Sequence, residues 1–364
     1  MNVLDFFQKN IADDLQDPNV NPLITVDSIK FMYTFRGQIT PHVSSGVLQV
    51  LVQKLGSPNY VVYNYAAIAL DRILVLTDDA RQPVISRDTI VGLSKQLVQH
   101  LFGLIEKNTA PEKVQENEFI MRCVMRVLIF IREGVLPIYE QVLTHLINIT
   151  KVIRHNPSNP RFYHYLFESI GAVIRYSTPQ KSEDLEGKLY NPFADILAED
   201  VAEFVPYVFQ LFAALLEANP SGTLTDYYKA LIPAIITPSL WGVKGNVPAL
   251  VRLLSAIIPR GAQNIVQNNQ VEPILGIFQK LVSTKVQESH GFDLLESIII
   301  SLPAEALQNY FVDIIRIILN RLSNSKTETF TLRFVRLYHL VSAKDDKGLG
   351  ADYFISVADQ VQNE

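Results

Sequence analysis

The chain has 364 residues, of which 48% are hydrophobic, and it carries a formal net charge of −5 at pH 7. This hydrophobic content excludes a disordered protein, and the slightly acidic balance does not favour nucleic acid, whose binding proteins usually present a basic face. The single cysteine, Cys123, excludes an internal disulfide framework. The N-terminus lacks the basic and apolar regions of a signal peptide, and no apolar run is long enough to span a bilayer, so we expect a soluble protein inside the cell.

Helical periodicity begins at the N-terminus. Apolar residues recur every three or four positions, as in amphipathic helices, and Asn-Pro, Thr-Pro and Ser-Pro pairs mark new helix starts. Residues 78–86 are polar and contain a proline, which indicates a loop, and Ser86 is expected to cap the helix that follows. The helices predicted in this region cover residues 1–16, 21–39, 40–55, 57–73 and 86–107.

Three more helices are predicted in the middle of the chain. The first covers residues 116–132 and the second 135–155, with Gly134 as the break between them. The third covers residues 161–176, and Asn159 is its predicted N-cap, followed by a proline at the first helical position. Each helix has one apolar stripe, so each needs a neighbour against which to bury it.

The pattern weakens and then recovers in the second half. Residues 177–188 are polar and charged and indicate either a loop or a frayed helix start, and residues 193–198 form a short apolar piece. The helix that starts at Asn246 is expected to end at the Pro-Arg-Gly sequence of residues 259–261. The helices predicted here cover residues 200–217, 225–236, 246–258, 273–282, 291–302, 304–322 and 327–343, with the start of another at 351–361.

Stacked helix pairs are the simplest way to bury all of these stripes. Pair starts recur every ~40–50 residues, the period of HEAT or armadillo arrays. We therefore predict an all-α protein, a right-handed α-solenoid of about eight HEAT-type helix pairs. Neither end carries a polar capping repeat, and we expect a segment of a longer array.

Catalytic and metal-binding patterns are not found in the sequence. The seven histidines do not adopt a metal-ligand spacing, and residues 242–245 lack the frame of a phosphate-binding loop. Paired carboxylates such as Asp13-Asp14 and Asp78-Asp79 are typical of solvated surface. We expect no enzyme activity, cofactor or metal ion.

Eight positions remain as candidates for contact with protein partners. Four lie in one predicted helix and share a face, for which a solvated helix surface is the alternative. Two more are the only tryptophan and a lysine three residues after it; tryptophan is enriched at binding hot spots, but filling a gap between repeats is the alternative. Two lie in the basic, polar turn 321–327, for which a plain helix–helix connection is the alternative. The candidates are Arg161, His164, Glu168 and Arg175; Trp241 and Lys244; and Arg321 and Lys326.

The sequence also resembles one family over nearly its whole length. The resemblance is specific to CAS-type exportins, the importin-α re-exporters of the importin-β (karyopherin) family, and it covers the middle segment of these receptors. It is carried by collinear stretches at residues 61–67, 117–122, 156–162, 167–170, 203–210, 245–254, 276–282 and 321–327.

The resemblance implies both an organisation and a function. Residues 1–115 would be the end of the exportin's central HEAT region and residues 116–364 the start of its C-terminal HEAT region, in one continuous solenoid. Such receptors bind importin-α together with GTP-bound Ran, meet nuclear pore proteins, and shuttle between nucleus and cytoplasm across the nuclear envelope. They are not enzymes, and the family implies neither nucleic-acid binding nor membrane insertion. A generic HEAT-repeat scaffold or regulatory subunit is the alternative function.

Overall fold

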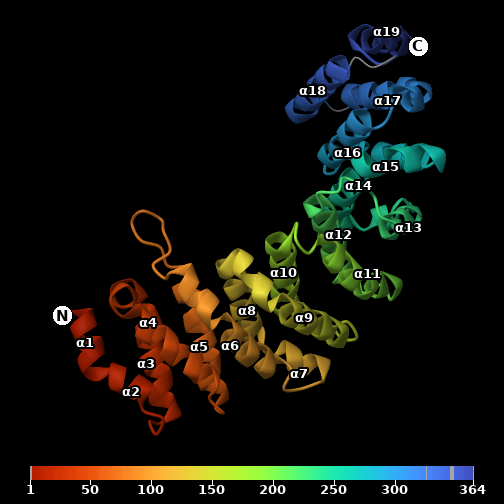
Figure 1. The fold of residues 1–364 in the computed structure, drawn as a ribbon. Helices are drawn as coiled ribbons and strands as arrows, with labels where there is room; N and C mark the ends of the chain where they lie inside the picture. Colours follow the sequence, from red (N-terminus) through yellow and green to blue (C-terminus); the bar gives the residue numbers. More distant parts are fainter. Residues whose placement is uncertain (1, 325, 345–347, 364) are drawn as a thin grey trace. The chain divides into compact units, whose positions relative to one another are not determined.

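The computed structural model describes residues 2–324, 326–344 and 348–363. It contains two compact units, one up to Val201 and one from Ala202 onward, and each is described by itself. No β-strand is found within the described ranges, and an isolated β-bridge joins Thr77 to Pro83 in the loop between α5 and α6 (Figure 1). The predicted all-α class is confirmed.

The first unit is built from two rows of helices. Its helices are α1 (Val3–Asn10), α2 (Ala12–Gln16), α3 (Pro22–Thr34), α4 (Arg36–Leu55), α5 (Tyr60–Leu74), α6 (Arg87–Ile105), α7 (Pro111–Gln115), α8 (Glu118–Ile131), the 3-10 helix η1 (Arg132–Ile138), α9 (Tyr139–Ile153), α10 (Pro160–Ser177) and α11 (Ser182–Ala198). Helices α3, α5, α8 and α10 contact one another in succession, and we call them the close-packed row of this unit. Helices α4 and α6 pack against one side of this row, and so do α9 and α11.

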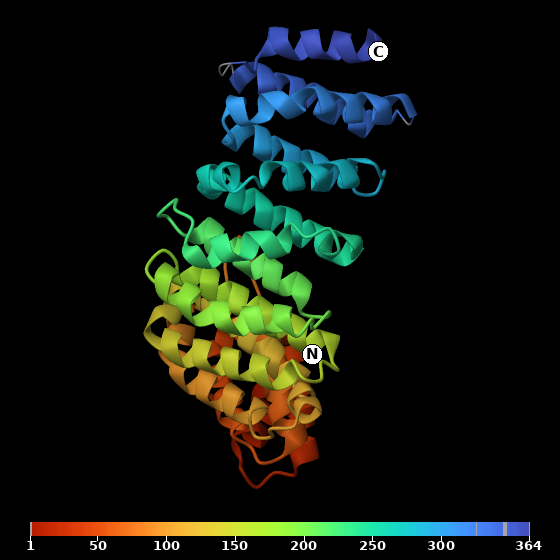
Figure 2. The ribbon, with the colours of Figure 1, turned by 90° about the vertical axis from the view of Figure 1, so that its right-hand side faces the viewer.

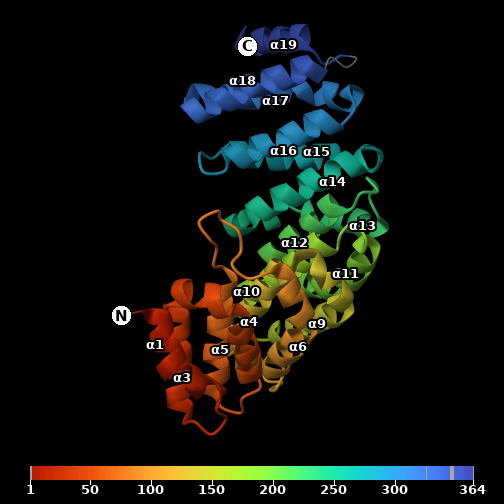
Figure 3. The same cartoon turned by 60° about the vertical axis from the view of Figure 1, so that its left-hand side comes forward.

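The second unit repeats this arrangement. Its helices are α12 (Val205–Ala218), α13 (Asp226–Ile235), the short 3-10 helices η2 (Leu240–Gly242) and η3 (Lys244–Asn246), α14 (Val247–Gln267), α15 (Val271–Val282), α16 (Glu288–Ser301), α17 (Ala304–Asn324), α18 (Glu328–Lys344) and α19 (Ala351–Asn363). Its close-packed row is α12, α14, α16 and α18, while α15, α17 and α19 follow one another in the second row. Figures 2 and 3 show α14 to α19 stacked as successive layers.

Asparagine caps begin three of the four close-packed helices in the first unit. The side chains of Asn21, Asn59 and Asn159 accept hydrogen bonds from the backbone N–H groups of the first helical turn. These bonds satisfy donors that have no partner inside the helix. The predicted cap at Asn159 is thus confirmed, whereas the Ser86 side chain makes no capping bond.

Helix boundaries in the first unit differ from prediction at several places. The predicted helix over residues 1–16 is broken at Ile11, and α4 begins at Arg36, before the proline that was expected to start it. Pro41 instead lies inside α4, which bends at Val43 (φ −134°, ψ 25°). The turn after residue 108 leads into the short helix α7, which the pattern did not predict.

Gly134 does not simply interrupt the helices of the central region. It lies within η1, which connects α8 to α9. A Cβ atom at this position would lie 2.6 Å from Cγ2 of Val91 on α6. Glycine is therefore required by the close approach of two elements.

Two helices are longer than the sequence predicted. The charged residues before 188 belong to α11, where Leu185, Leu189 and Phe193 are buried at a spacing of four. Helix α14 does not end at residue 258 but continues to Gln267 with a bend at Gly261. A Cβ at Gly261 would lie 2.6 Å from Cδ2 of Leu224, so the glycine lets the helix pass close to a neighbouring loop.

Candidate partner-binding surface

Cations lie over aromatic rings between the first two helices of the close-packed row. The amine of Lys30 on α3 lies 5.9 Å from the ring centroid of Tyr65 on α5. In the opposite direction, the guanidinium of Arg72 on α5 lies 4.7 Å from the ring centroid of Tyr33 on α3. Each such contact contributes about 0.5–1 kcal/mol at an exposed site. The two helices thus present paired charges and rings on their solvent side.

A buried carboxylate joins α5 to α8. The Asp71 side chain is only 6% exposed, and its two oxygens lie 3.0 Å from Nε of Arg122 and 2.9 Å from Nε of Arg126. Both arginines remain partly exposed, which keeps their remaining donors available to solvent or to a partner. A buried charge needs such partners, because an uncompensated one costs several kcal/mol.

Helix α8 is linked to α10 through Glu118. Its carboxylate lies 3.6 Å from the Arg161 guanidinium and accepts a hydrogen bond of 3.1 Å from the side-chain amide of Asn159. The Arg122 guanidinium also lies 5.9 Å from the ring centroid of Tyr165 on α10. The ion pairs and cation–ring contacts thus run in succession from α3 through α5 and α8 to α10, and we call this series the ladder. Arg161 is 76% exposed, so its ion pair is weak and its charge faces solvent.

The four candidates on α10 lie on one exposed helix face. The structure brings Arg161, His164, Glu168 and Arg175 together in this way, at the end of the ladder. Arg175 also lies 5.9 Å from the ring centroid of Tyr176. This face combines exposed charges with a rigid, capped helix behind them, an arrangement suited to recognising a charged protein surface. Contact with a partner stays a prediction.

The neighbouring candidates Trp241 and Lys244 have different environments. Trp241 is 1% exposed and donates a hydrogen bond of 2.8 Å from its indole nitrogen to the Ile235 carbonyl. This corrects the interpretation of Trp241 as a surface hot spot: it fills space between helices, which is the alternative reading of the sequence. Lys244 is exposed, next to Val243, which is 56% exposed. The structure therefore leaves Lys244 as the surface candidate here.

The predicted turn at 321–327 is partly helical. Residues up to Asn324 belong to α17, and Ser325 lies outside the described residues. Arg321 was expected to be exposed, but its side chain is 11% exposed and lies 2.7 Å from the buried carboxylate of Glu288 on α16. Lys326 is exposed. Arg321 is thus a structural residue, and Lys326 is the candidate of this turn that remains at the surface.

Ion pairs also join neighbouring helices in the close-packed row of the second unit, and the hydrophobic periodicity of the sequence did not predict them. Arg252 on α14 forms two hydrogen bonds, of 3.0 and 2.6 Å, with the Glu217 carboxylate on α12. On α18, Arg333 and Arg336 lie 3.3 and 3.1 Å from the Glu296 carboxylate on α16, and Arg333 also contacts Asp293. In the sequence, these ion pairs are indicated only by an arginine that follows an acidic residue by about one repeat length, as Arg252 follows Glu217.

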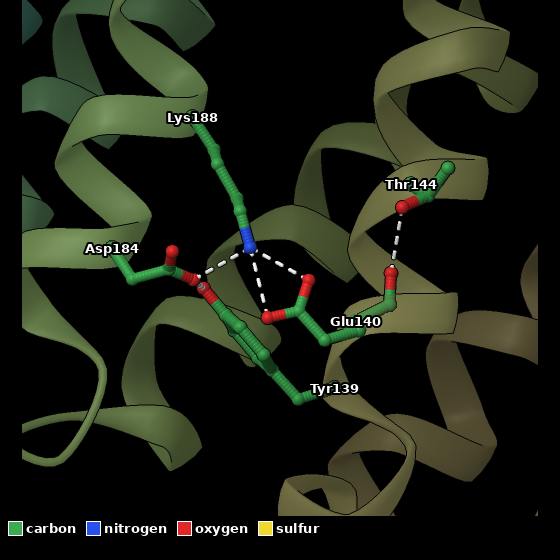
Figure 4. Close-up of polar contacts among 5 residues, drawn as sticks. All are labelled: Tyr139, Glu140, Thr144, Asp184 and Lys188. Carbon is green, nitrogen blue, oxygen red and sulfur yellow. Dashed lines mark hydrogen bonds and ion pairs between the residues drawn. The ribbon is translucent and has the colours of Figure 1, made fainter.

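A different polar cluster joins α9 to α11 in the first unit (Figure 4). The Lys188 amine lies 2.6 Å from Glu140 and 2.8 Å from Asp184, and the Tyr139 hydroxyl donates to Asp184 at 2.8 Å. Burial, helped by the hydrogen bond to Asp184, raises the pKa of Tyr139. Desolvation acts to raise the pKa of Asp184, but hydrogen bonds from Lys188 and Tyr139 outweigh it and lower that pKa. These four side chains form a polar cluster, here called the clasp, that joins α9 to α11.

Chemistry of other kinds has little support in the described residues. Burial raises the pKa of the Cys123 thiol, which is fully enclosed and therefore unreactive. Within residues 2–324, 326–344 and 348–363, no group of three or more His, Cys, Asp or Glu side chains is placed to hold a metal ion. Over the same ranges, none of the helices combines the length and apolarity needed to cross a membrane.

Comparison with known proteins gives the family. The model described as "CAS/CSE protein, C-terminus" matches residues 71–364, and the model described as "Cse1" matches residues 1–70. The importin-alpha re-exporter of Schizosaccharomyces pombe is 40% identical over the whole of this chain, which spans 38% of that relative's length.

Solved structures agree with this match. The exportin Cse1 in its cargo-free, cytoplasmic state superposes on the whole chain with a TM-score of 0.88 at 37% identity, over 37% of its own length. Importin beta superposes on 99% of the chain, and 42% of its own, with a TM-score of 0.73 at 15% identity, which shows the shared solenoid fold alone. The HEAT-type solenoid predicted from the sequence is confirmed, and the chain belongs to the CAS/CSE family of exportins.

Proposed function

We propose that the chain is a segment of a nuclear transport receptor that exports importin-α from the nucleus to the cytoplasm in complex with GTP-bound Ran. The observation that carries this proposal is the 40% identity to an importin-alpha re-exporter over the full chain. The chain spans about two fifths of such relatives, so importin-α and Ran are proposed as partners of the receptor to which this segment contributes.

Within this function the exposed face of α10 is the first candidate for partner contact. Arg161, His164, Glu168 and Arg175 support it by their exposure and by their position at the end of the ladder of charges and rings. Lys244 and Lys326 are secondary candidates on the second unit. Trp241 and Arg321 act inside the fold.

Several finer features follow from the family and are proposals too. They are contact with nuclear pore proteins, shuttling between nucleus and cytoplasm with passage at the nuclear envelope, and the absence of enzyme activity. The division into a central HEAT region over 1–115 and a C-terminal HEAT region over 116–364 also stays a prediction.

A chimera tests the function directly. This chain would replace the matching segment of the S. pombe re-exporter, and binding of importin-α would be measured with GTP-bound and with GDP-bound Ran. We expect retention of importin-α only with the GTP form. Equal retention in both nucleotide states, or none in either while the parent receptor binds, would contradict the proposal. A generic scaffold has no reason to show nucleotide dependence.

Charge reversal then tests the surface. The double change Arg161→Glu and Arg175→Glu in the chimera should weaken the ternary complex by roughly tenfold, chiefly by slowing association, because exposed charges steer encounter. Lys151→Glu, an exposed basic residue at the end of α9, is the matched control and should leave affinity unchanged. An equal effect of the two variants would remove the α10 face from the interface.

A further inference from the structure

A buried amide ties the short helix α7 to the loop that leads into α10. The Gln115 side chain is 1% exposed, and its Nε2 donates to the carbonyls of Pro111, at 3.0 Å, and Asn156, at 2.8 Å. Its Oε1 accepts from the backbone N–H groups of Ser158, at 2.9 Å, and Asn159, at 3.1 Å. A neutral amide offers two donors and two acceptor positions, so all four are used here.

The loop at residues 154–159 depends on these bonds. Three of the four partners of the amide lie in this loop, 41 to 44 residues after Gln115 in the chain. Pro157 lies among them and Pro160 follows, and a proline has no backbone N–H to donate. The amide gives this irregular segment the backbone partners that regular secondary structure gives elsewhere, so its removal would leave several polar groups unpaired.

Gln115 also holds the cap of α10. Asn159 Oδ1 accepts from the backbone N–H groups of Arg161 and Phe162, at 3.1 and 3.3 Å, and so begins the helix. The side-chain amide of Asn159 donates to the backbone carbonyl of Gln115 at 3.0 Å and to the Glu118 carboxylate at 3.1 Å. Gln115 therefore holds the cap residue twice, once through its main chain and once through its side chain.

The segments before α3 and α5 are held by contacts within themselves. The N–H of Asn59, the cap of α5, donates to Ser57 Oγ at 3.2 Å. Ahead of α3, the N–H of Asn19 donates to the Asp17 carboxylate at 2.8 Å. The segment before α10 is instead held by a residue more than forty positions earlier. This long-range attachment thus serves the helix that carries the exposed candidate face.

We propose that Gln115 is the positioning residue of the partner-binding face of α10. It is buried and does not touch a partner itself. It acts through Asn159, which sets the first turn of α10 and thereby the place at which Arg161 presents its charge. The energy between two charges depends on their separation, so a displaced Arg161 binds a charged surface less well. This inference rests on the proposed function, because the face that Gln115 positions is the one proposed to contact a partner.

Hydrogen exchange on the chimera without partners tests the positioning itself. Gln115→Met keeps the length of the side chain but removes its four hydrogen bonds, and amide exchange over residues 156–162 should become roughly tenfold faster through local opening. Exchange over α5 should not change. The control Ser169→Ala removes a buried hydrogen bond of 2.7 Å to the Tyr165 carbonyl on the same helix and should leave residues 156–162 unchanged.

Three outcomes of this measurement would overturn the proposal whether or not a partner binds. They are unchanged exchange over residues 156–162 in Gln115→Met, an equal acceleration there in Ser169→Ala, and global unfolding of Gln115→Met. The last would assign Gln115 to the stability of the whole fold rather than to the placement of one helix.

A double-mutant cycle in the chimera then ties the position of α10 to partner contact. Gln115→Met should weaken the complex with importin-α and GTP-bound Ran by roughly threefold while Arg161 is present, and should have no further effect beside Arg161→Ala. Equal weakening in both backgrounds would give Gln115 a merely structural role and overturn the proposal, as would an Arg161→Ala chimera that binds as tightly as the parent chimera. The nucleotide dependence of the parent chimera is measured first and tests the proposed function separately.

Discussion

The step from α5 to α8 and the step from α14 to α16 solve the same packing problem with different polar chemistry. In both, two helices of a close-packed row lie side by side with their apolar faces buried. Across the first, Asp71 is held by Arg122 and Arg126, and across the second two serines, Ser255 and Ser297, face an open hollow. Apolar burial therefore sets the repeat, while the polar residues above it give each step its own properties.

The largest expected effect comes from removing both arginines at the first step. Arg122→Ala with Arg126→Ala leaves the Asp71 carboxylate buried without a partner, and we expect a loss of about 3–5 kcal/mol in unfolding free energy. Each single change should cost less than half of this, because one arginine still holds the acid. Denaturant unfolding provides the measurement. Additive single effects would show that Asp71 does not depend on the pair.

A smaller effect is expected at the clasp between α9 and α11. Tyr139→Phe removes the hydroxyl that donates to Asp184, while Lys188 still holds that carboxylate. The expected loss is about 1 kcal/mol, the usual net value of one hydrogen bond. Thermal unfolding of the variant against the parent chain measures it. If Tyr139→Phe lowered the unfolding free energy as much as the double arginine variant does, the partly exposed Asp184 would depend on its partners as strongly as the buried Asp71 does.

Converting the second step into the first should have a smaller effect still. Ser255→Glu with Ser297→Arg would place an acid on α14 and an arginine on α16, as Asp71 and Arg122 are placed on α5 and α8. We expect a gain of at most about 0.5–1 kcal/mol, because the new pair is close to the surface. The unfolding free energy is compared with that of each single variant. A destabilised double variant would show that the hollow is too small for the pair.

The clasp should show no pH dependence near neutrality. The pKa of Asp184 is lowered from 3.8, against the opposing effect of desolvation, by hydrogen bonds from Lys188 and Tyr139. The contribution of Asp184 to the free energy of unfolding is therefore fully present above pH 3.8, and it is lost as the pH falls through the lowered pKa of Asp184. The pKa of Lys188 is raised from 10.5, chiefly by its hydrogen bond to Asp184, so its contribution is lost only as the pH rises through the raised value.

The corresponding measurement compares two pH profiles. The difference in unfolding free energy between the parent chain and Lys188→Met should be constant from about pH 5 to about pH 9 and should shrink at both extremes. A slope inside this window would assign the clasp to a different titrating group.

Local sequence was sufficient for most helices and for the exposed face of α10. Arg161, His164 and Glu168 were recognisable because helical spacing alone places them on one side. Helix bends were less predictable: Gly261 looked like a terminator because its reason, the approach of Leu224, lies in another segment.

Buried candidates could not be distinguished from exposed ones for the same reason. The acceptor of Arg321 is Glu288, thirty-three residues earlier. The Trp241 indole finds its acceptor six residues away, in the preceding helix. Periodicity shows where a side chain leaves its own helix but does not show what covers it. The polar pairs that distinguish one step from another are of this kind, and only the folded arrangement displays them.

Hydrogen exchange tests the central claim most directly, namely that the exposed face of α10 contacts a partner while the clasp between α9 and α11 only supports the fold. Amide exchange would be followed in the chimera, free and in complex with importin-α and GTP-bound Ran. We predict slower exchange over residues 156–177 on complex formation, with α9 and α11 unchanged. Unchanged exchange over residues 156–177, or an equal slowing of all three helices, would contradict this account.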